Sequence, residues 1–161
     1  MKGCRTALCA AISVVCVLVL AAAAFAADNF SGSWKVNLDK STYSPGPPPK
    51  SLTSTIQVMG PTMNFMFDGY DSEGKSILYE ELSIMVDGKD YPVKDDPSRD
   101  TTAMKKIDDF TLEQTNKKDG KVTTITRTVY SRDGKARTAT TTGANAQGQK
   151  VNNIVFSDRV R

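Results

Sequence analysis

Apolar and polar positions alternate along most of this chain, from FSGSWKVN at residues 30–37 to VNNIVFSD at residues 151–158. Runs such as TTITRTVY and RTATTT place β-branched residues at alternate positions, which is typical of strands buried on one face. Helix-forming residues in this part of the chain are not arranged at helical spacing. The pattern therefore predicts an all-β domain.

Turn signals divide the alternation at regular intervals. Glycines at positions 60, 74, 88, 120, 134 and 148 mark successive turns, and three of them lie in Asp-Gly-Lys. Asp-Gly between alternating runs favours a tight hairpin, because both residues tolerate positive φ. We therefore predict an antiparallel up-and-down meander barrel of about 8–10 strands. The predicted strands are 31–37, 52–59, 63–70, 75–86, 89–93, 101–107, 110–116, 121–131, 135–143 and 149–158.

The first 26 residues differ in composition from the rest. Two basic residues precede a long apolar run, and AFA at residues 24–26 fits the small-x-small cleavage rule. We expect residues 1–26 to be a secretory signal peptide and residues 27–161 to be a single exported domain, periplasmic or extracellular. An uncleaved membrane anchor is the alternative, because the apolar run approaches spanning length. All three cysteines lie in this segment, so the mature chain would have no thiol.

Composition narrows the chemistry of the mature chain. The absence of histidine removes the commonest general base and metal ligand. Without the N-terminal segment, 19 basic and 18 acidic residues remain, and a net charge of +1 gives no footprint for nucleic acid. The acidic pairs at 95–96 and 108–109 lie in predicted turns, and Glu80 and Glu81 point to opposite faces of a strand. We therefore expect no catalytic residue, no metal and no cofactor.

Alternation also assigns side chains to the two faces of each strand. Phe65 and Phe67 share one face, and Leu82 and Ile84 share another. Arg127 lies among apolar residues on its face, and an inward Arg127 would need a partner or a ligand. The alternative is that Arg127 faces solvent and Tyr130 faces the core. The candidate ligand-binding residues of the interior are Phe65, Phe67, Leu82, Ile84, Arg127 and Tyr130.

The meander has one interruption, DKSTYSPGPPPK at residues 39–50. Prolines at positions 45 and 47–49 favour extended chain with polyproline character. We expect a rigid connector that crosses an end of the barrel or lies over its side. A proline motif that binds a partner is the alternative.

The stretch FSGSWKVN resembles the Gly-x-Trp opening strand of lipocalins and fatty-acid-binding proteins, and the mature chain resembles small exported bacterial proteins described as lipocalin-like. The resemblance implies that Trp34 closes the base of the barrel beneath an arginine of the last strand, Arg159 or Arg161. Such a contact is worth about 0.5–2 kcal/mol. Gly32 would let another chain segment approach closely. YSPGPPPK stands where fatty-acid-binding proteins have a helical lid, so their ligand class does not carry over.

Two interpretations of the interior remain open. The modest supply of apolar residues suits a barrel that holds a small, partly hydrophobic molecule, or a narrow barrel filled by its own side chains. The first predicts an exported, monomeric, non-enzymatic binding protein, and the second a structural or protein-interaction barrel of the cell envelope. An enzyme that works through Arg127, tyrosines and carboxylates is a third interpretation. Neither nucleic acid nor a membrane span of the mature chain is expected.

Overall fold

The computed structural model describes residues 28–94 and 96–160, and for residues 79–83 it describes the backbone alone. The predicted signal peptide lies outside the described residues. Within the described part of the chain, no helix is long and apolar enough to cross a membrane.

Ten antiparallel strands form one sheet, as the alternation and the turn spacing predict. Their observed limits fall within two residues of the predicted ones. One short 3-10 helix, η1 (Leu38–Lys40), follows the first strand. The strands are β1 (Gly32–Val36), β2 (Ser51–Met59), β3 (Thr62–Tyr70), β4 (Ser76–Met85), β5 (Asp87–Pro92), β6 (Thr101–Asp108), β7 (Thr111–Lys118), β8 (Lys121–Tyr130), β9 (Ala136–Ala144) and β10 (Lys150–Arg159).

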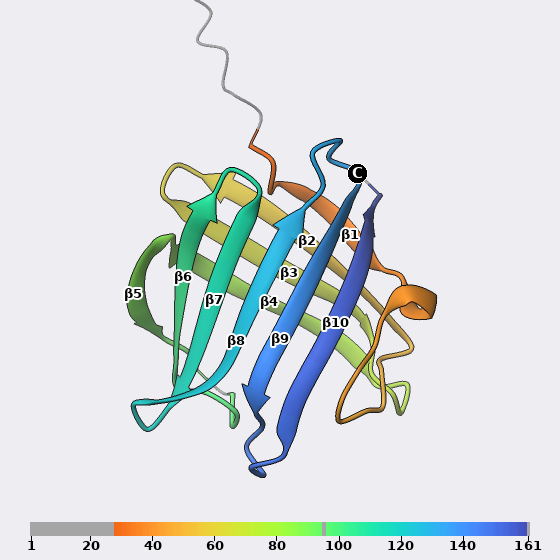
Figure 1. Ribbon diagram of the computed structural model, residues 1–161, viewed down its shortest axis with the longest axis vertical. Coiled ribbons are helices and arrows are strands. Elements are labelled where there is room, and N and C mark those ends of the chain that lie inside the picture. Colours follow the sequence, from red (N-terminus) through yellow and green to blue (C-terminus); the bar gives the residue numbers. More distant parts are fainter. Residues whose placement is uncertain (1–27, 95, 161) are drawn as a thin grey trace, which may run out of the picture.

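The sheet curls into a half-barrel with two ends. Its strand order is β4-β3-β2-β1-β10-β9-β8-β7-β6-β5, so all neighbouring strands are consecutive in the sequence except β1 and β10, which pair the first strand with the last. In Figure 1, β6 to β10 lie in front and β2 to β4 cross behind them. β4 and β5 are the end strands of the sheet, although a short connection joins them in sequence.

The apolar core lies on the inner, concave face at one end of the half-barrel. Trp34 is 0% exposed and lies among side chains from β2, β3, β4, β6, β7 and β8. Alternation along each strand places every second residue on this face. The buried cluster consists of Phe30, Trp34, Ile56, Met63, Ile84, Met104, Leu112 and Tyr130.

The inward placement of Arg127 is wrong. Tyr130 is buried in the core, and Thr126 on the same face of β8 bonds Thr141 of β9 through their hydroxyls at 2.8 Å. Arg127 is exposed and shares the outer face with Ile125 and Val129, which are 39% and 47% exposed. A strand has a period of two, so burying the large Tyr130 ring sends the guanidinium to solvent, where its charge stays hydrated.

The pairing of β3 with β4 is interrupted by an irregularity. Phe65 lies opposite Glu81 and Met63 lies opposite Ile84, with a register shift between them. Strict alternation therefore does not hold across residues 81–84, because a bulge changes which face successive residues point to. Leu82 lies in this stretch, and its side chain is outside the described residues.

The proline segment lies alongside β10. Thr42 forms an isolated antiparallel bridge with Ile154, and the Ser44 carbonyl accepts a bond from the Asn152 N–H at 2.7 Å. The chain then returns to β2, where the Lys50 N–H donates to the Tyr70 carbonyl at 2.9 Å. The segment thus continues along β10 beyond the end of β1. This agrees with a connector that lies over the side of the barrel.

Gly143 on β9 sits where two strands approach closely. Its φ is 140°, and a Cβ there would overlap the Thr123 carbonyl oxygen of β8. Gly120 in the β7–β8 turn also has positive φ, at 72°, but open space surrounds its Cβ position. Of these two glycines, Gly143 is required both by its backbone conformation and by the close approach of the β8 backbone.

We expect Gly143→Ala to lower the free energy of unfolding by about 1–3 kcal/mol more than Gly120→Ala, because the first adds a backbone clash to the strain of positive φ. Chemical denaturation of both variants measures the difference. Equal losses would show that β8 and β9 are not in close contact there.

Candidate functional site

Trp34 is the centre of the buried end. Its indole Nε1–H donates to the Phe30 carbonyl at 3.2 Å. The Tyr130 ring meets both Trp34 and Phe30 edge-on, with centroids 5.1 Å apart in each pair. These contacts join Phe30 and β1 to β8, which is three strands away from β1 in the sheet.

Two arginines cover the Trp34 ring. Arg159 lies directly across the β1–β10 ladder, with its guanidinium carbon 4.5 Å from the ring centroid. Arg137 of β9 lies with the same atom 5.4 Å from the ring and 5.9 Å from the Tyr130 ring. Arg159 thus occupies the place that the resemblance implies, and Arg161 lies outside the described residues.

Arg137 was missed by the sequence analysis. Its segment, ARTATTT, has small and hydroxyl residues on both faces, so hydrophobic alternation assigns no inner face to it. The pairing of Arg137 with Tyr130 across β8 and β9 is what places it over the core. The number of residues in the turn between β8 and β9 sets this register. It is the sequence signal that could have placed Arg137 opposite Tyr130.

The Arg137 side chain crosses the inner face from β9 to β2. Its Nη1 donates to the Tyr130 hydroxyl at 3.3 Å, and its Nη2 donates to the Ser54 hydroxyl. Ser54 is 2% exposed and lies next to Trp34 across the β1–β2 ladder. The Nε atoms of Arg137 and Arg159 are buried and have no hydrogen-bond partner.

Tyr130 is held neutral at this end. Burial raises the pKa of its hydroxyl above the ordinary value, and the neighbouring Arg137 charge opposes that rise. A neutral hydroxyl that accepts from Arg137 keeps its own proton available for donation.

A polar network continues along the inner face of β6, β7 and β8. The Asn116 Oδ1 accepts from Thr102 Oγ1 at 2.9 Å and from Arg99 Nη1 at 3.0 Å. Its Nδ2 donates to Thr124 Oγ1 at 3.0 Å, and Gln114 Nε2 donates to Thr102 Oγ1 at the same distance. The inner face is therefore apolar and cationic at the Trp34 end and polar farther along these strands, where the Arg99 charge is paired with Asp96.

Some of the candidate ligand-binding residues of the interior belong to the buried cluster, and others lie beside it. Ile84 and Tyr130 belong to the buried cluster, and Phe65 packs against it. Phe65 and Phe67 stack with centroids 6.4 Å apart and an interplanar angle of 11°, and both are partly buried. The structure thus brings four of the six candidates to one face, excludes Arg127, and leaves the Leu82 side chain undescribed.

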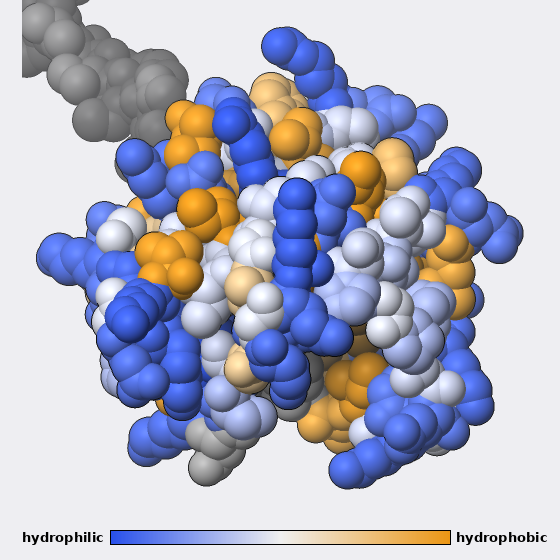
Figure 2. Space-filling view, turned by 60° about the horizontal axis from the view of Figure 1, so that its bottom comes forward, coloured by the Kyte–Doolittle hydropathy of each residue, from blue (hydrophilic) through white to orange (hydrophobic). Residues whose placement is uncertain are grey.

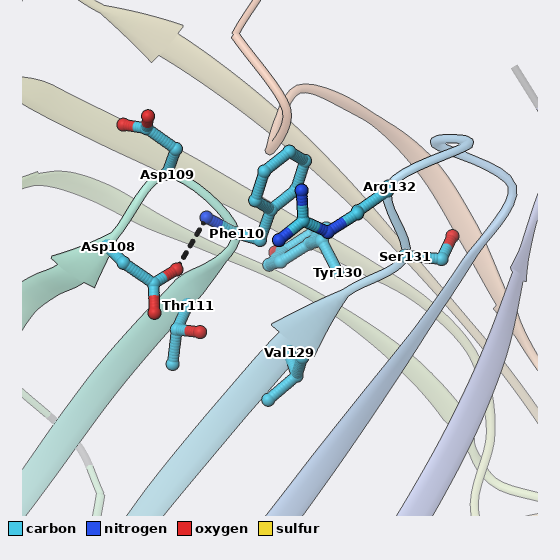
Figure 3. Close-up of a pocket in the computed structure, with 8 residues that line it drawn as sticks. All are labelled: Asp108, Asp109, Phe110, Thr111, Val129, Tyr130, Ser131 and Arg132. Atoms are coloured by element: carbon cyan, nitrogen blue, oxygen red, sulfur yellow. Dashed lines mark hydrogen bonds between the residues drawn. The ribbon is translucent and has the colours of Figure 1, made fainter.

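A separate open hollow of about 730 Å³ lies at the β6–β7 turn and the end of β8 (Figure 3). The guanidinium of Arg132 lies over the Phe110 ring, 5.3 Å from its centroid. The Phe110 N–H donates to Asp108 Oδ1 at 2.8 Å. The hollow is lined by Asp108, Asp109, Phe110, Thr111, Val129, Tyr130, Ser131 and Arg132. Tyr130 is the candidate interior residue that lines it, whereas Phe65, Phe67 and Ile84 do not, so the hollow differs from the predicted interior site.

Several carboxylates serve the turns, as their positions predict. Backbone N–H groups of Lys89 and Phe110 bond Asp87 and Asp108, and these bonds hold the pKa values of both carboxyls below the ordinary value. Among the described residues, no group of three or more acidic side chains could hold a metal ion. These carboxylates have the positions of turn-stabilising residues.

Figure 2 views the molecule from the end that faces down in Figure 1. Hydrophilic side chains dominate this face, and hydrophobic groups form separate patches between them. The hydrophobic groups therefore form no continuous surface on the face that Figure 2 shows.

One solved structure shares this arrangement of strands. The crystal structure of zebrafish ileal bile acid-binding protein complexed with cholic acid matches 82% of this chain and 99% of its own chain, with a TM-score of 0.52. This chain has a calycin fold. The sequence identity is 18%, so the likeness is one of fold. The sequence matches no protein-family model and no curated protein.

The calycin fold confirms the resemblance drawn from FSGSWKVN. Trp34 lies in the first strand of this calycin fold, and an arginine of the last strand lies over its ring. The second arginine, Arg137, comes from the strand before the last. Two arginines therefore lie over Trp34 in this protein, where the resemblance implies one.

We expect Trp34→Ala to lower the free energy of unfolding by about 3–5 kcal/mol, because it removes a large, fully buried aromatic side chain. Tyr70→Ala is the matched control, since Tyr70 is an aromatic residue of the same sheet that is 54% exposed. It should change stability by less than about 0.5 kcal/mol. Urea denaturation measures both, and similar losses would refute a closing role for Trp34.

Proposed function

We propose that this protein is exported and binds a small, partly hydrophobic molecule on the concave inner face of its half-barrel, without catalysing a reaction. The observation that carries the proposal is the partial exposure of inward-facing residues beyond the core. A barrel filled by its own side chains would bury them. Inward-facing residues of β3, β8, β9 and β10 are only partly buried, among them Phe67, Thr126, Ala139, Thr141 and Val155.

The chemistry of this face supports the same proposal. Stacked Phe65 and Phe67 rings offer an apolar wall, and the threonines and Asn116 offer a few hydrogen-bonding groups. Apolar surface with a small number of polar groups is what small-molecule sites use. The calycin fold adds support, because the zebrafish protein of the same fold is a bile acid-binding protein complexed with cholic acid.

Ala139→Trp should abolish binding of N-phenylnaphthylamine, a neutral apolar dye, because it fills the inner face between Thr128 and Val155. Thr140→Trp is the matched control, since the neighbouring residue points to the outer face of β9. It should bind the dye as the unmodified protein does. Fluorescence titration measures the affinity, and equal binding by the two variants would refute an interior site.

Export makes a separate prediction. The protein recovered from its host should have the mass of a chain beginning at Ala27 or Asp28, because AFA precedes the expected cleavage point. Asp28 Oδ1 accepts the Phe30 N–H at 2.9 Å, so cleavage there would keep this contact. Intact-mass spectrometry of the periplasmic, medium and membrane fractions is the measurement. The uncleaved mass in the membrane fraction would indicate the anchor instead.

A further inference from the structure

The tripeptide Asp-Gly-Lys occurs three times in this chain, at residues 87–89, 119–121 and 133–135. The side chain of an aspartate that precedes glycine can lose water to the next backbone nitrogen, because glycine has no Cβ to obstruct the approach. The three copies have the same local sequence. Any difference in their reactivity therefore comes from the fold around each copy.

The carboxylate of the first copy, Asp87, is held on both oxygens. Its Oδ1 accepts from the Lys89 backbone N–H at 3.0 Å, and its Oδ2 accepts from the Tyr91 hydroxyl at 3.0 Å. The Lys89 N–H bond lowers the pKa of this carboxyl group, which keeps it ionised at neutral pH. An ionised carboxylate is a poor electrophile, so these contacts protect Asp87 from attack by a backbone nitrogen.

The carboxylate of the last copy, Asp133, is held in the same way. Its Oδ1 accepts from the Ser131 hydroxyl at 2.6 Å and from the Lys135 N–H at 3.1 Å. The Ser131 hydroxyl is the main cause of the lowered pKa of this carboxyl group. The Gly134 N–H is engaged too, since it donates to the Ser131 carbonyl at 2.9 Å. Both groups that would react in this copy are therefore occupied.

The middle copy, in the turn between β7 and β8, has both reacting groups free. This turn lies at the end of the molecule that faces down in Figure 1. Asp119 is exposed, and its carboxylate has no hydrogen bond or ion pair with a described residue. The Gly120 N–H has no described backbone partner, and open space surrounds its Cβ position. Among the described residues other than glycine, Asp119 alone has a positive φ, at 50°, which is a strained conformation.

We propose that Asp119 is a modification site at which the folded protein converts aspartate to isoaspartate without an enzyme. The Gly120 nitrogen forms a bond to Cγ of the protonated carboxyl group, and the carboxyl hydroxyl leaves as water with the amide proton. Water then adds to the Asp119 backbone carbonyl carbon of the resulting ring. The bond from that carbon to the Gly120 nitrogen breaks, and the chain continues through Cγ. One water leaves and one enters, so the product has the same mass as the original chain.

The modification changes the contacts of this turn. The Asp119 N–H donates to Asp100 Oδ2 at 2.7 Å, and Lys118 pairs with Lys121 across the turn. Isoaspartate places Cβ in the backbone, so the turn becomes one atom longer and loses the geometry of a two-residue hairpin. We therefore expect faster amide hydrogen exchange at Asp119 and Lys121 in the modified chain, and loss of the bond to Asp100.

Digestion with endoproteinase Asp-N distinguishes the three copies, because this enzyme cuts before aspartate and not before isoaspartate. The uncut peptides that report conversion at Asp87, Asp119 and Asp133 are residues 71–89, 109–132 and 119–157, respectively. During long incubation of the folded protein at neutral pH, conversion at Asp119 should be at least about tenfold faster than at either other copy, since those copies must first break hydrogen bonds to a charged group. Mass spectrometry of digests taken before and during incubation measures the rates.

The same chain unfolded in urea is the matched control. Unfolding removes the hydrogen bonds at Asp87 and Asp133, so the three copies should convert at similar rates. Ser131→Ala gives a second comparison in the folded protein, because it removes the hydroxyl that bonds the Asp133 carboxylate. This variant should raise the rate at Asp133 and leave the rate at Asp119 unchanged.

Two results would overturn the proposal. Equal rates at the three copies of the folded protein would show that the contacts of Asp87 and Asp133 give no protection. Conversion at Asp119 in urea but not in the folded protein would show that the turn itself prevents ring closure. Both results come from the natural sequence, so they do not depend on how Ser131→Ala folds, and neither depends on whether the interior binds a ligand.

Discussion

The packing of Trp34 beneath Arg159 and Arg137 is the contact on which this fold depends. It joins the first strand to the last two, and it brings Tyr130 and Phe30 into the same cluster. The described part of the chain contains one short 3-10 helix and no cysteine, so it has few other means of joining its first and last strands. The large Trp34 side chain therefore stands where these two strands pair, and cationic groups stabilise its ring.

The same contact divides the inner face into two chemical zones. Near Trp34 the side chains are buried and the unpaired charge is positive, whereas along β6 to β8 hydroxyls and amides bond one another. Phe65 and Phe67 lie between the buried core and the more open face. The inner face therefore changes from cationic groups over Trp34, through aromatic surface, to hydrogen-bonded polar groups along β6 to β8.

β4 and β5 stand at opposite ends of the strand order. The ladders run from β4 through β1 and β10 to β5, and the pairing is irregular in the ladders of both end strands. The outer face carries exposed Leu78 and Met66, whereas Ile84 and Tyr130 are buried in the core and Phe65 packs against it.

The sequence by itself predicted a meander of about 8–10 strands with limits within two residues of the observed ones, and the resemblance of FSGSWKVN implied the place of Trp34. Alternation and Asp-Gly turns are local signals, and the meander needs no long crossover. Only the tertiary structure decided which face of β8 is buried. Both faces carry β-branched residues that suit a strand, and the burial of Tyr130 decides between them. The place of Arg137 over the core was likewise not predicted. It depends on contacts with residues of β1, β2 and β8, and those of β1 and β2 lie far from Arg137 in the sequence. A charge site built across strands depends on register and sheet curvature, which no short stretch of sequence specifies.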